Sequence, residues 1–183
     1  MVKEIEKKFL LRENGTDHVT QAELNKLGFE SVQELVDTVR NEGEHLDQRY
    51  LPLEIGYQII DNLGEKVDFE IKEARLRDKE GFYNFAIKSD GNVERDELTF
   101  PVSGEFYDTI WEIPTERTSK FRLEVDIGNY TYEIDVYNNM DLILAEVEVT
   151  TRDELGNVLS FGKDITYDKS YKNRNLAKRF ARD

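Results

Sequence analysis

The architecture of the chain follows from Glu4-Ile5-Glu6-Lys7-Lys8-Phe9-Leu10, where charged and apolar side chains alternate. Alternation with a period of two predicts a β-strand, and it places Glu4, Glu6 and Lys8 on one face because successive side chains of a strand point to opposite sides. The same alternation returns at residues 73–77, 83–88, 120–125, 132–136 and 145–149. Asp78 to Gly81, Gly91-Asn92 and Gly128-Asn129 predict turns between these segments. The sequence therefore predicts several short antiparallel strands.

Most of these strands carry two like charges two residues apart, on the same face. The pairs are Arg75 and Arg77, Lys120 and Arg122, Glu133 and Asp135, and Glu146 and Glu148. Like charges this close repel each other and weaken a strand unless something compensates them. Paired carboxylates favour a hard divalent cation such as Mg²⁺ or Mn²⁺, and paired Arg and Lys favour a polyanion such as a phosphate chain. The pattern therefore predicts a site for metal ions and phosphate.

Two segments interrupt the alternation. Thr20 to Glu23 and Ser31 to Glu34 both have the S/T-x-x-E form of a capping box, and apolar residues at helical spacing follow each one. They predict a pair of helices, which we describe as a helical insertion at about residues 18–42. Ser103 to Trp111 and Asn173 to Arg182 also have helical spacing.

Length and composition restrict the class of protein. The 183 residues fit a single domain spanning 1–183, and we find no linker of Ser, Gly or Pro. The net charge of -14 argues against binding to nucleic acid or to an anionic membrane. The chain has no cysteine, which excludes thiolate metal sites. No apolar run is long enough for a membrane span, and the first six residues lack the apolar core of a signal peptide, so we expect a cytoplasmic protein.

The first strand resembles the amino-terminal E-x-E-x-K signature of the CYTH superfamily, also called triphosphate tunnel metalloenzymes. Further stretches match the family in chain order: Gln48-Arg49-Tyr50-Leu51, Arg75-Leu76-Arg77, Ala86-Ile87-Lys88-Ser89, Arg95-Asp96-Glu97, Lys120-Phe121-Arg122, Tyr132-Glu133-Ile134-Asp135-Val136, Leu144-Ala145-Glu146-Val147-Glu148 and Gly162-Lys163-Asp164-Ile165-Thr166, the last followed by Tyr171-Lys172-Asn173. The resemblance implies a β-dominated α+β fold, a closed eight-stranded antiparallel β-barrel with peripheral helices. It also implies a polar tunnel that binds a triphosphate together with Mg²⁺ or Mn²⁺.

The resemblance assigns roles to individual residues. It implies that the metal carboxylates are Glu4, Glu6, Glu146 and Glu148, with Glu133 and Asp135 as further support. It implies that the phosphate ligands are Lys8, Arg75, Arg77, Lys88, Arg95, Lys120, Arg122 and Lys163. It implies catalytic roles for Lys8 and Tyr50, with the tyrosine paired to the lysine. Arg49 stands where the family often has glycine, and Asp164 replaces the commoner glutamate.

Three functions are compatible with these residues. The first is metal-dependent hydrolysis of the terminal phosphoryl group of inorganic triphosphate or of a small organic triphosphate. The second is a class IV adenylate cyclase, which makes cyclic AMP and pyrophosphate from ATP. The third is a non-catalytic module that binds polyphosphate or nucleotides. The expected partner is a small molecule containing a triphosphate, without nucleic acid or membrane, and a homodimer is left open.

A basic cluster lies near the carboxyl end of an otherwise acidic chain. Its members are Lys169, Lys172, Arg174, Lys178, Arg179 and Arg182. Two interpretations stay open for it: a solvated face of the last helix, or, as the resemblance to the family implies, a lid helix over the mouth of the tunnel.

Overall fold

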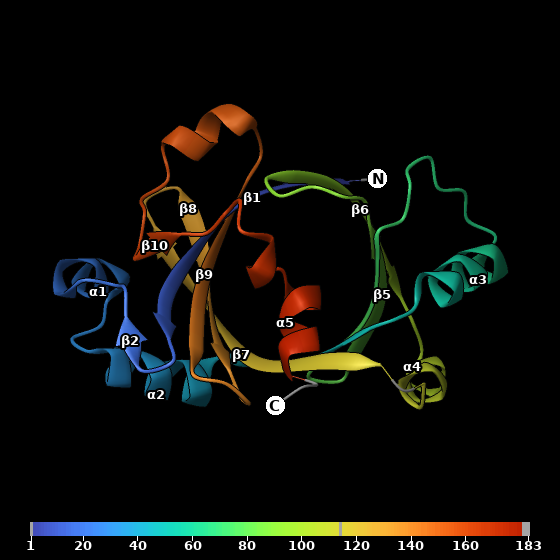
Figure 1. Ribbon diagram of the computed structural model, residues 1–183, viewed down its shortest axis with the longest axis horizontal. Helices are drawn as coiled ribbons and strands as arrows, with labels where there is room; N and C mark the ends of the chain where they lie inside the picture. The colour runs from blue at the N-terminus through green and yellow to red at the C-terminus, as the bar shows by residue number, and fades with distance from the viewer. Residues whose placement is uncertain (1, 114, 181–183) are drawn as a thin grey trace. The chain divides into compact units, whose positions relative to one another are not determined.

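The computed structural model describes residues 2–113 and 115–180, and antiparallel strands dominate it (Figure 1). The strands are hydrogen-bonded in the order β10-β1-β6-β5-β4-β3-β7-β8-β9, and β9 also pairs with β1. This pairing closes a ring of eight strands, to which the two-residue strands β2 and β10 add at β1. The predicted fold class, a β-dominated α+β protein with a closed eight-stranded antiparallel barrel, is confirmed.

The elements have the following bounds. The strands are β1 (Val2–Glu13), β2 (Thr16–Asp17), β3 (Glu44–Tyr50), β4 (Glu73–Lys79), β5 (Phe82–Lys88), β6 (Glu94–Pro101), β7 (Glu116–Ile127), β8 (Tyr130–Tyr137), β9 (Leu142–Val149) and β10 (Lys163–Asp164). The helices are α1 (Gln21–Leu27), α2 (Val32–Glu42), α3 (Leu53–Leu63), α4 (Gly104–Trp111) and α5 (Asn173–Phe180), with short 3₁₀ turns η1 (Arg152–Gly156) and η2 (Lys169–Tyr171).

The chain divides into two compact units. Unit 1 consists of Met1–Glu4, Leu46–Thr118 and Lys169–Asp183, and unit 2 consists of Ile5–His45 and Ser119–Asp168. Each unit is described by itself below.

Unit 1 has one apolar and one charged sheet face. Leu76 of β4 lies opposite Phe85 of β5, and the core that these two side chains share also contains Ile59 of α3 and Tyr107 of α4. The alternate positions of the same strands carry the charged side chains, because neighbouring residues of a strand point to opposite faces. The register places Lys88 of β5 directly opposite Glu73 and, on the other side, opposite Glu97. The helices therefore cover the apolar face of these strands, and the charged side chains lie on the opposite face.

Unit 2 repeats this division of faces. Ile134 of β8 and Ala145 of β9 are direct partners on the apolar face, and both are fully buried. On the opposite face Glu146 lies between Glu133 of β8 and Lys8 of β1. Helix α2 packs against β8. The charged pairs found by their spacing therefore share the face opposite the apolar core.

Of the two capping boxes predicted for the helices of unit 2, one is complete and the other is half formed. Thr20 and Glu23 form the complete predicted capping box at the start of α1. At α2 the Ser31 hydroxyl accepts from the Glu34 N–H, but the Glu34 carboxylate accepts from the N–H of Glu30 and not from that of Ser31. The second box is therefore only half formed, because the carboxylate satisfies an N–H group one residue earlier.

Some elements differ from the predictions. Strands β3 and β6 and helix α3 were not predicted as such. Helix α3 follows Pro52, which makes no side-chain cap, so it has no capping signature. Helix α5 was expected to reach Arg182, but that residue lies outside the described residues. Within the described residues no helix is both long enough and apolar enough to cross a membrane.

Candidate functional site

The charged face of unit 2 holds six ionisable side chains, which we call the Glu146 cluster. Its members are Lys8, Lys120, Arg122, Glu133, Asp135 and Glu146. They come from four adjacent strands, so the sheet register fixes their spacing. The cluster has three positive and three negative groups and is electrically balanced.

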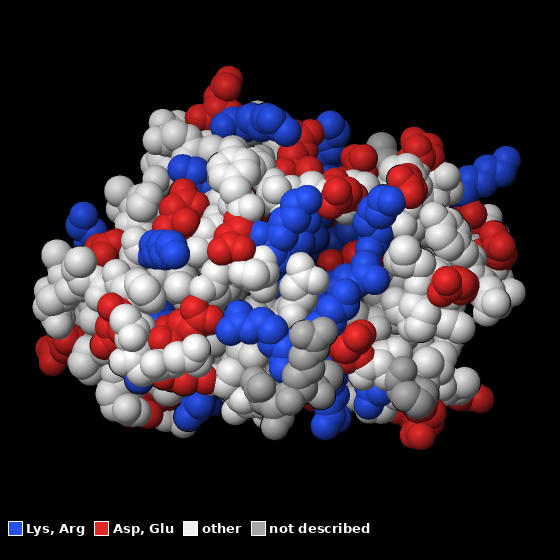
Figure 2. Space-filling model, in the orientation of Figure 1, with Lys and Arg blue, Asp and Glu red and all other residues white. Residues whose placement is uncertain are grey.

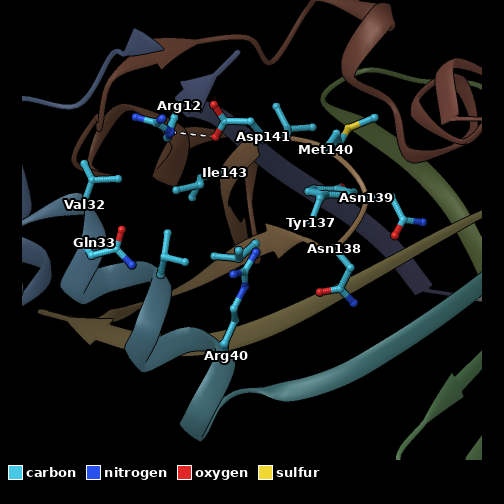
Figure 3. A pocket seen from close by; sticks show the side chains of 13 residues that line it. Arg12, Val32, Gln33, Arg40, Tyr137, Asn138, Asn139, Met140, Asp141 and Ile143 are labelled. Atoms are coloured by element: carbon cyan, nitrogen blue, oxygen red, sulfur yellow. Dashed lines mark hydrogen bonds and ion pairs between the residues drawn. The ribbon is translucent and has the colours of Figure 1, made fainter. Parts of the chain in front are cut away.

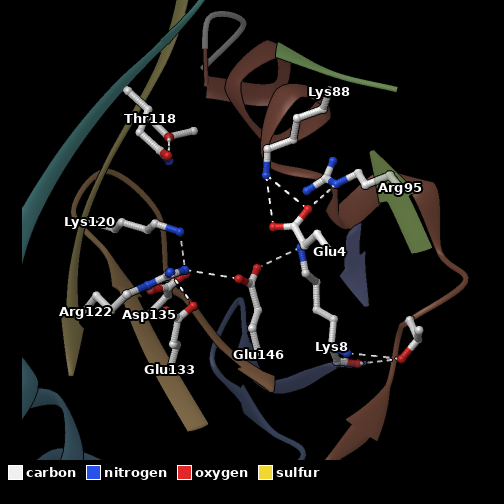
Figure 4. Close-up of polar contacts among 12 residues, drawn as sticks. Glu4, Lys8, Lys88, Arg95, Thr118, Lys120, Arg122, Glu133, Asp135 and Glu146 are labelled. Carbon is white, nitrogen blue, oxygen red and sulfur yellow. Dashed lines mark hydrogen bonds and ion pairs between the residues drawn. The ribbon is translucent and has the colours of Figure 1, made fainter. Parts of the chain in front are cut away.

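Asp135 is the most buried carboxylate of this cluster and binds two cations. Arg122 lies directly opposite it, donating from Nε to Oδ1 (2.6 Å) and from Nη2 to Oδ2 (2.7 Å). The Lys120 ammonium donates to Oδ2 as well (Figure 4). Burial raises the pKa of Asp135, but Arg122 and Lys120 outweigh burial and hold that pKa below its usual value. Asp135 therefore compensates one of the two positive charges on β7, and Glu133 and Glu146 compensate the rest through Arg122.

Glu146 accepts cations from two sides. Its Oε1 lies 2.8 Å from Lys8 Nζ, and its Oε2 accepts from Arg122 Nη2 at 3.1 Å. Burial raises the pKa of Glu146, and the cations Lys8, Arg122 and Lys120 together bring it well below the usual value. Oε1 is buried, and the Lys8 ammonium is its contact among the described residues. A buried oxygen of this kind has lone pairs available for another cation.

Two members of the Glu146 cluster have pKa values shifted toward the neutral form. Burial and then Arg122 lower the pKa of Lys120 to about 8, although Asp135 opposes both. Burial also raises the pKa of Glu133, and Glu146 and Asp135 raise it further against the effect of Arg122. Ionisable groups shifted in this way are enriched at functional sites.

The charged face of unit 1 carries a second set, which we call the Glu4 cluster. Its members are Glu4, Glu73, Arg75, Lys88, Arg95 and Glu97. Lys88 Nζ lies 3.0 Å from Glu4 Oε1 and 3.0 Å from Glu97 Oε2, and Arg95 Nε donates to Glu4 Oε2 (Figure 4). Burial raises the pKa of Glu4, but Lys88 and Arg95 lower it to about 2. This cluster is also balanced at three charges of each sign.

Arg75 is the cation of the Glu4 cluster with the fewest partners. Its Nη2 lies 3.7 Å from Glu97 Oε1, and its Nε is buried without a hydrogen-bond partner among the described residues. Leaving a buried donor unpaired costs free energy, so this guanidinium is suited to an acceptor supplied by a ligand.

Tyr50 and Gln48 extend the polar surface along β3. The Tyr50 hydroxyl is buried without a partner among the described residues, and burial raises its pKa far above the usual value. The phenol is therefore a proton donor at ordinary pH. Gln48 Oε1 accepts from Arg77 Nε (2.9 Å) and Nη2 (2.8 Å), while its Nε2 donates to the Thr118 hydroxyl at 3.3 Å. Arg77 is thus oriented by the Gln48 amide, to which sequence analysis gave no role although it lies in a stretch that matches the family.

The remaining predicted site residues are more exposed. Glu6 and Glu148 are direct partners across β1 and β9, Glu6 half-buried and Glu148 exposed. Lys163 is exposed on the short strand β10. Sequence analysis missed Glu73 and Glu97 as members of the Glu4 cluster. Their signal was present, because Glu73 begins an alternating strand and Glu97 ends the Arg95-Asp96-Glu97 match.

The donor chemistry of unit 2 fits a divalent metal ion. Glu133 and Glu146 lie directly opposite each other and favour a cation between them. The Arg122 guanidinium takes that place and forms ion pairs with both carboxylates, so a metal ion would have to displace it. The buried Oε1 of Glu146 is one oxygen ligand, and Glu133, 35% exposed, can offer another. Asp135 fits less well because two cations already occupy its oxygens. The described residues contain no ready-made group of three acidic or His ligands, so ligand exchange would have to complete the site.

A hollow of about 640 Å³ between α2 and the β8–β9 turn has a different character (Figure 3). Its ionic contact joins Arg12 to Asp141 (2.7 Å) and to Asp17 (2.6 Å), which ties β1 to that turn. Neither cluster contributes a charged side chain to its walls. The candidate site therefore lies on the charged sheet faces and not in this hollow.

Comparisons with known proteins show what this chain is similar to. No family model matches the chain. Over 112 residues, or 57% of the chain, it is 30% identical to an inorganic triphosphatase of Nitrosomonas europaea, of which the match covers 74%. The crystal structure of the inorganic triphosphatase NE1496 is similar over 97% of this chain and 95% of that one, with 24% identity and a TM-score of 0.54. A crystal structure of the hypothetical protein NE1496 gives 24% identity and a TM-score of 0.53, over 95% and 96% of the two chains.

The fold and the buried charge define a class, namely closed antiparallel β-barrel proteins whose strands carry buried clusters of Lys, Arg, Asp and Glu. Within that class, the chain belongs to the CYTH superfamily, the triphosphate tunnel metalloenzymes. The family resemblance inferred from the E-x-E-x-K signature is therefore confirmed.

Proposed function

We propose that the chain is a triphosphatase that hydrolyses the terminal phosphoryl group of inorganic triphosphate or of a small organic triphosphate, assisted by Mg²⁺ or Mn²⁺. The observation that carries the proposal is the burial of six cationic side chains, each at most 15% exposed, among carboxylates of the two clusters. A buried unpaired charge costs several kcal/mol, on the order of the whole stability of a domain. The carboxylates of the clusters pair these cations, but burying ion pairs contributes little to stability, so a set of this size is expected where a ligand uses it.

The six cations are Lys8, Lys120 and Arg122 in the Glu146 cluster and Arg75, Lys88 and Arg95 in the Glu4 cluster. We assign phosphate binding to all six, with Arg77 and Lys163 as further ligands. Phosphate oxygens can replace carboxylate oxygens as partners of Arg and Lys because both form charge-assisted hydrogen bonds. Binding then exchanges one set of ion pairs for another and leaves no cation unpaired.

The same exchange releases carboxylates for the metal ion. We assign Glu146 and Glu133 as its ligands in unit 2, with Glu6 and Glu148 beside them. In unit 1 we assign Glu4 as a metal carboxylate. When bound, a divalent cation shields the phosphate charge and acidifies water. We assign Asp135 to holding Arg122 and Lys120 in position and not to direct contact with the metal ion.

Tyr50 and Lys8 are assigned to the reacting groups. Tyr50 is a neutral hydroxyl donor at ordinary pH, so we assign it hydrogen bonding to a phosphate oxygen and not proton abstraction. Lys8 is fixed through its backbone, because its N–H donates to the Thr166 hydroxyl and its carbonyl accepts from the Ile165 N–H. Its ammonium is assigned to phosphate binding and to proton transfer.

Product analysis tests this proposal. Purified protein is incubated with tripolyphosphate, thiamine triphosphate or ATP, each with Mg²⁺ or Mn²⁺, and orthophosphate, pyrophosphate and cyclic AMP are quantified. We expect metal-dependent release of orthophosphate that Glu146→Gln abolishes and that the exposed control Glu65→Gln retains. Cyclic AMP with pyrophosphate would instead establish a cyclase, and binding without turnover would establish a binding module. Full activity of Glu146→Gln would remove the carboxylate from the site.

A further inference from the structure

A fully buried amide lies on the charged face of unit 1. Gln48 of β3 is 0% exposed and is the direct partner of Arg77 on β4. Its Oε1 accepts from Arg77 Nε at 2.9 Å and from Nη2 at 2.8 Å, and its Nε2 donates at 3.3 Å to the hydroxyl of Thr118, which is 1% exposed. The amide is therefore fixed at both ends and holds the guanidinium in one orientation.

The chemistry of the three groups determines which way the amide points. A guanidinium has donors and no acceptor, so the Gln48 atom that faces Arg77 has to be the oxygen. The amide nitrogen then faces Thr118, whose hydroxyl can accept. The two bonds to Gln48 use the side of the guanidinium that carries Nε. The side that carries Nη1 can face a phosphate oxygen in the forked geometry that arginine favours.

The residues directly opposite Arg75 and Arg77 on the neighbouring strands are all neutral. They are Tyr50 and Ala86 beside Arg75, and Gln48 and Asn84 beside Arg77. Gln48 is thus an acceptor that adds no negative charge next to two cations of one strand. A carboxylate at this position would orient Arg77 equally well, but it would also cancel part of the positive potential that attracts an anion.

Other cations of the protein have carboxylate neighbours. Lys88, on the same face of unit 1, lies directly between Glu73 and Glu97. On the molecular surface, Figure 2 shows Lys and Arg side chains interspersed with those of Asp and Glu. An amide as the acceptor for Arg77 therefore departs from the way the chain compensates its cations elsewhere.

We propose that Gln48 is a positioning residue for phosphate binding, whose neutral amide orients the Arg77 guanidinium toward the substrate without reducing its positive charge. The inference rests on the proposed function and adds a residue that acts through Arg77 and does not itself contact the substrate. It requires two properties of the side chain at position 48, an acceptor oxygen and the absence of charge.

Two variants separate these properties. Gln48→Met keeps the length and the neutrality but lacks the oxygen acceptor, and Gln48→Glu keeps the acceptor but adds a charge. Gln58→Glu, which adds the same charge at an exposed position of α3, is the control. Dissociation constants for tripolyphosphate are measured by calorimetry in EDTA, so that no divalent ion supports turnover, and kcat/KM is measured with Mg²⁺.

We expect both Gln48 variants to bind tripolyphosphate at least about tenfold more weakly than the wild type, the factor for one hydrogen bond to a charged group, and the control to change less than about twofold. In an Arg77→Met background, Gln48→Met should change the dissociation constant by less than about twofold, because the residue acts through Arg77. Asn84→Asp places a carboxylate opposite Arg77 from β5, and it should weaken binding in the same direction even if the buried position 48 does not tolerate a charge.

The outcomes distinguish this inference from the proposed function. Wild-type affinity in both Gln48→Glu and Asn84→Asp would overturn the role of neutrality. An equal effect of Gln48→Met with and without Arg77 would mean that Gln48 contributes through packing, and would overturn the positioning role. Binding of tripolyphosphate without turnover would overturn the proposed function alone, because the dissociation constants would still test Gln48. A wild type that does not bind tripolyphosphate would overturn both.

Discussion

Replacing Glu4 with glutamine should remove a pH-dependent part of the stability of unit 1. Burial raises the pKa of this carboxyl, but Lys88 and Arg95 lower it from the ordinary value of 4.5 to about 2. At about 1.36 kcal/mol for each pKa unit, this difference corresponds to about 3 kcal/mol of folding free energy. Because the folded-state pKa lies below that of the unfolded chain, the stabilisation is complete above pH 4.5 and is lost as the pH falls toward 2.

Urea unfolding of the wild type, Glu4→Gln and the exposed control Glu65→Gln, followed by the fluorescence of Trp111, measures this contribution. At pH 7 we expect Glu4→Gln to be about 3 kcal/mol less stable than the wild type, with Glu65→Gln unchanged. At pH 3 the deficit should be about half as large, because Glu4 of the folded wild type is then closer to its own pKa. Other carboxylates titrate in all three proteins, so the difference isolates Glu4.

Two results would refute this reasoning. A deficit below about 1 kcal/mol at pH 7 would mean that Lys88 and Arg95 find other partners or water at little cost. A deficit of the same size at pH 7 and at pH 3 would mean that Glu4 contributes through packing and not through its charge.

The other predictions concern unit 2. Burial and Arg122 lower the pKa of Lys120 from 10.5 to about 8, so between these pH values the unfolded chain binds more protons than the folded one. Stability should therefore rise with pH in this range. Urea unfolding at several pH values should show the wild type gaining about 3 kcal/mol from pH 8 to 10.5 relative to Lys120→Met. Gly162→Ala should lose about 1–3 kcal/mol in urea unfolding, because φ is +63° and a Cβ would lie 2.2 Å from the Leu10 carbonyl oxygen. Gly156→Ala, where a Cβ would have open space, is its control, and an equal effect would contradict the clash. Thr20→Ala should cost about 1 kcal/mol in thermal unfolding through loss of the α1 cap, and an unchanged Tm would mean that the cap adds nothing.

The alternation of charged and apolar residues in the sequence was enough to predict which charged side chains of a strand lie together on one buried face. Lys120 and Arg122, or Glu133 and Asp135, were identifiable because residues two apart on a strand share a face whatever the strand pairs with. Their partners were not identifiable, because the pairing of Arg122 with Asp135 depends on the register of β7 and β8. That register brings opposite charges together across neighbouring strands. The like charges of one strand are thus compensated within the protein and not only by a ligand.

The features that sequence analysis missed have weak local signals. Strand β6 begins Glu94-Arg95-Asp96-Glu97, four charged residues in succession, so alternation appears only from Leu98 onward. Helix α3 follows Pro52 without a capping side chain. The lowered pKa of Lys120 arises from complete burial beside Arg122, and burial of a lysine depends on the tertiary structure. Local patterns therefore predict which residues share a face, whereas pairing and burial come from the assembled sheet.

The charge distribution reconciles an acidic protein with an anionic substrate. Long-range repulsion from a net charge of -14 would oppose the approach of a triphosphate. The two clusters each contain equal numbers of cations and carboxylates, so the negative excess lies entirely on other residues. At physiological ionic strength charges are screened beyond about 8 Å, and a bound phosphate therefore responds mainly to its immediate neighbours. Those neighbours are balanced in the clusters, so the proposed capture of phosphate depends on the local arrangement of charge and tolerates the acidic surface elsewhere.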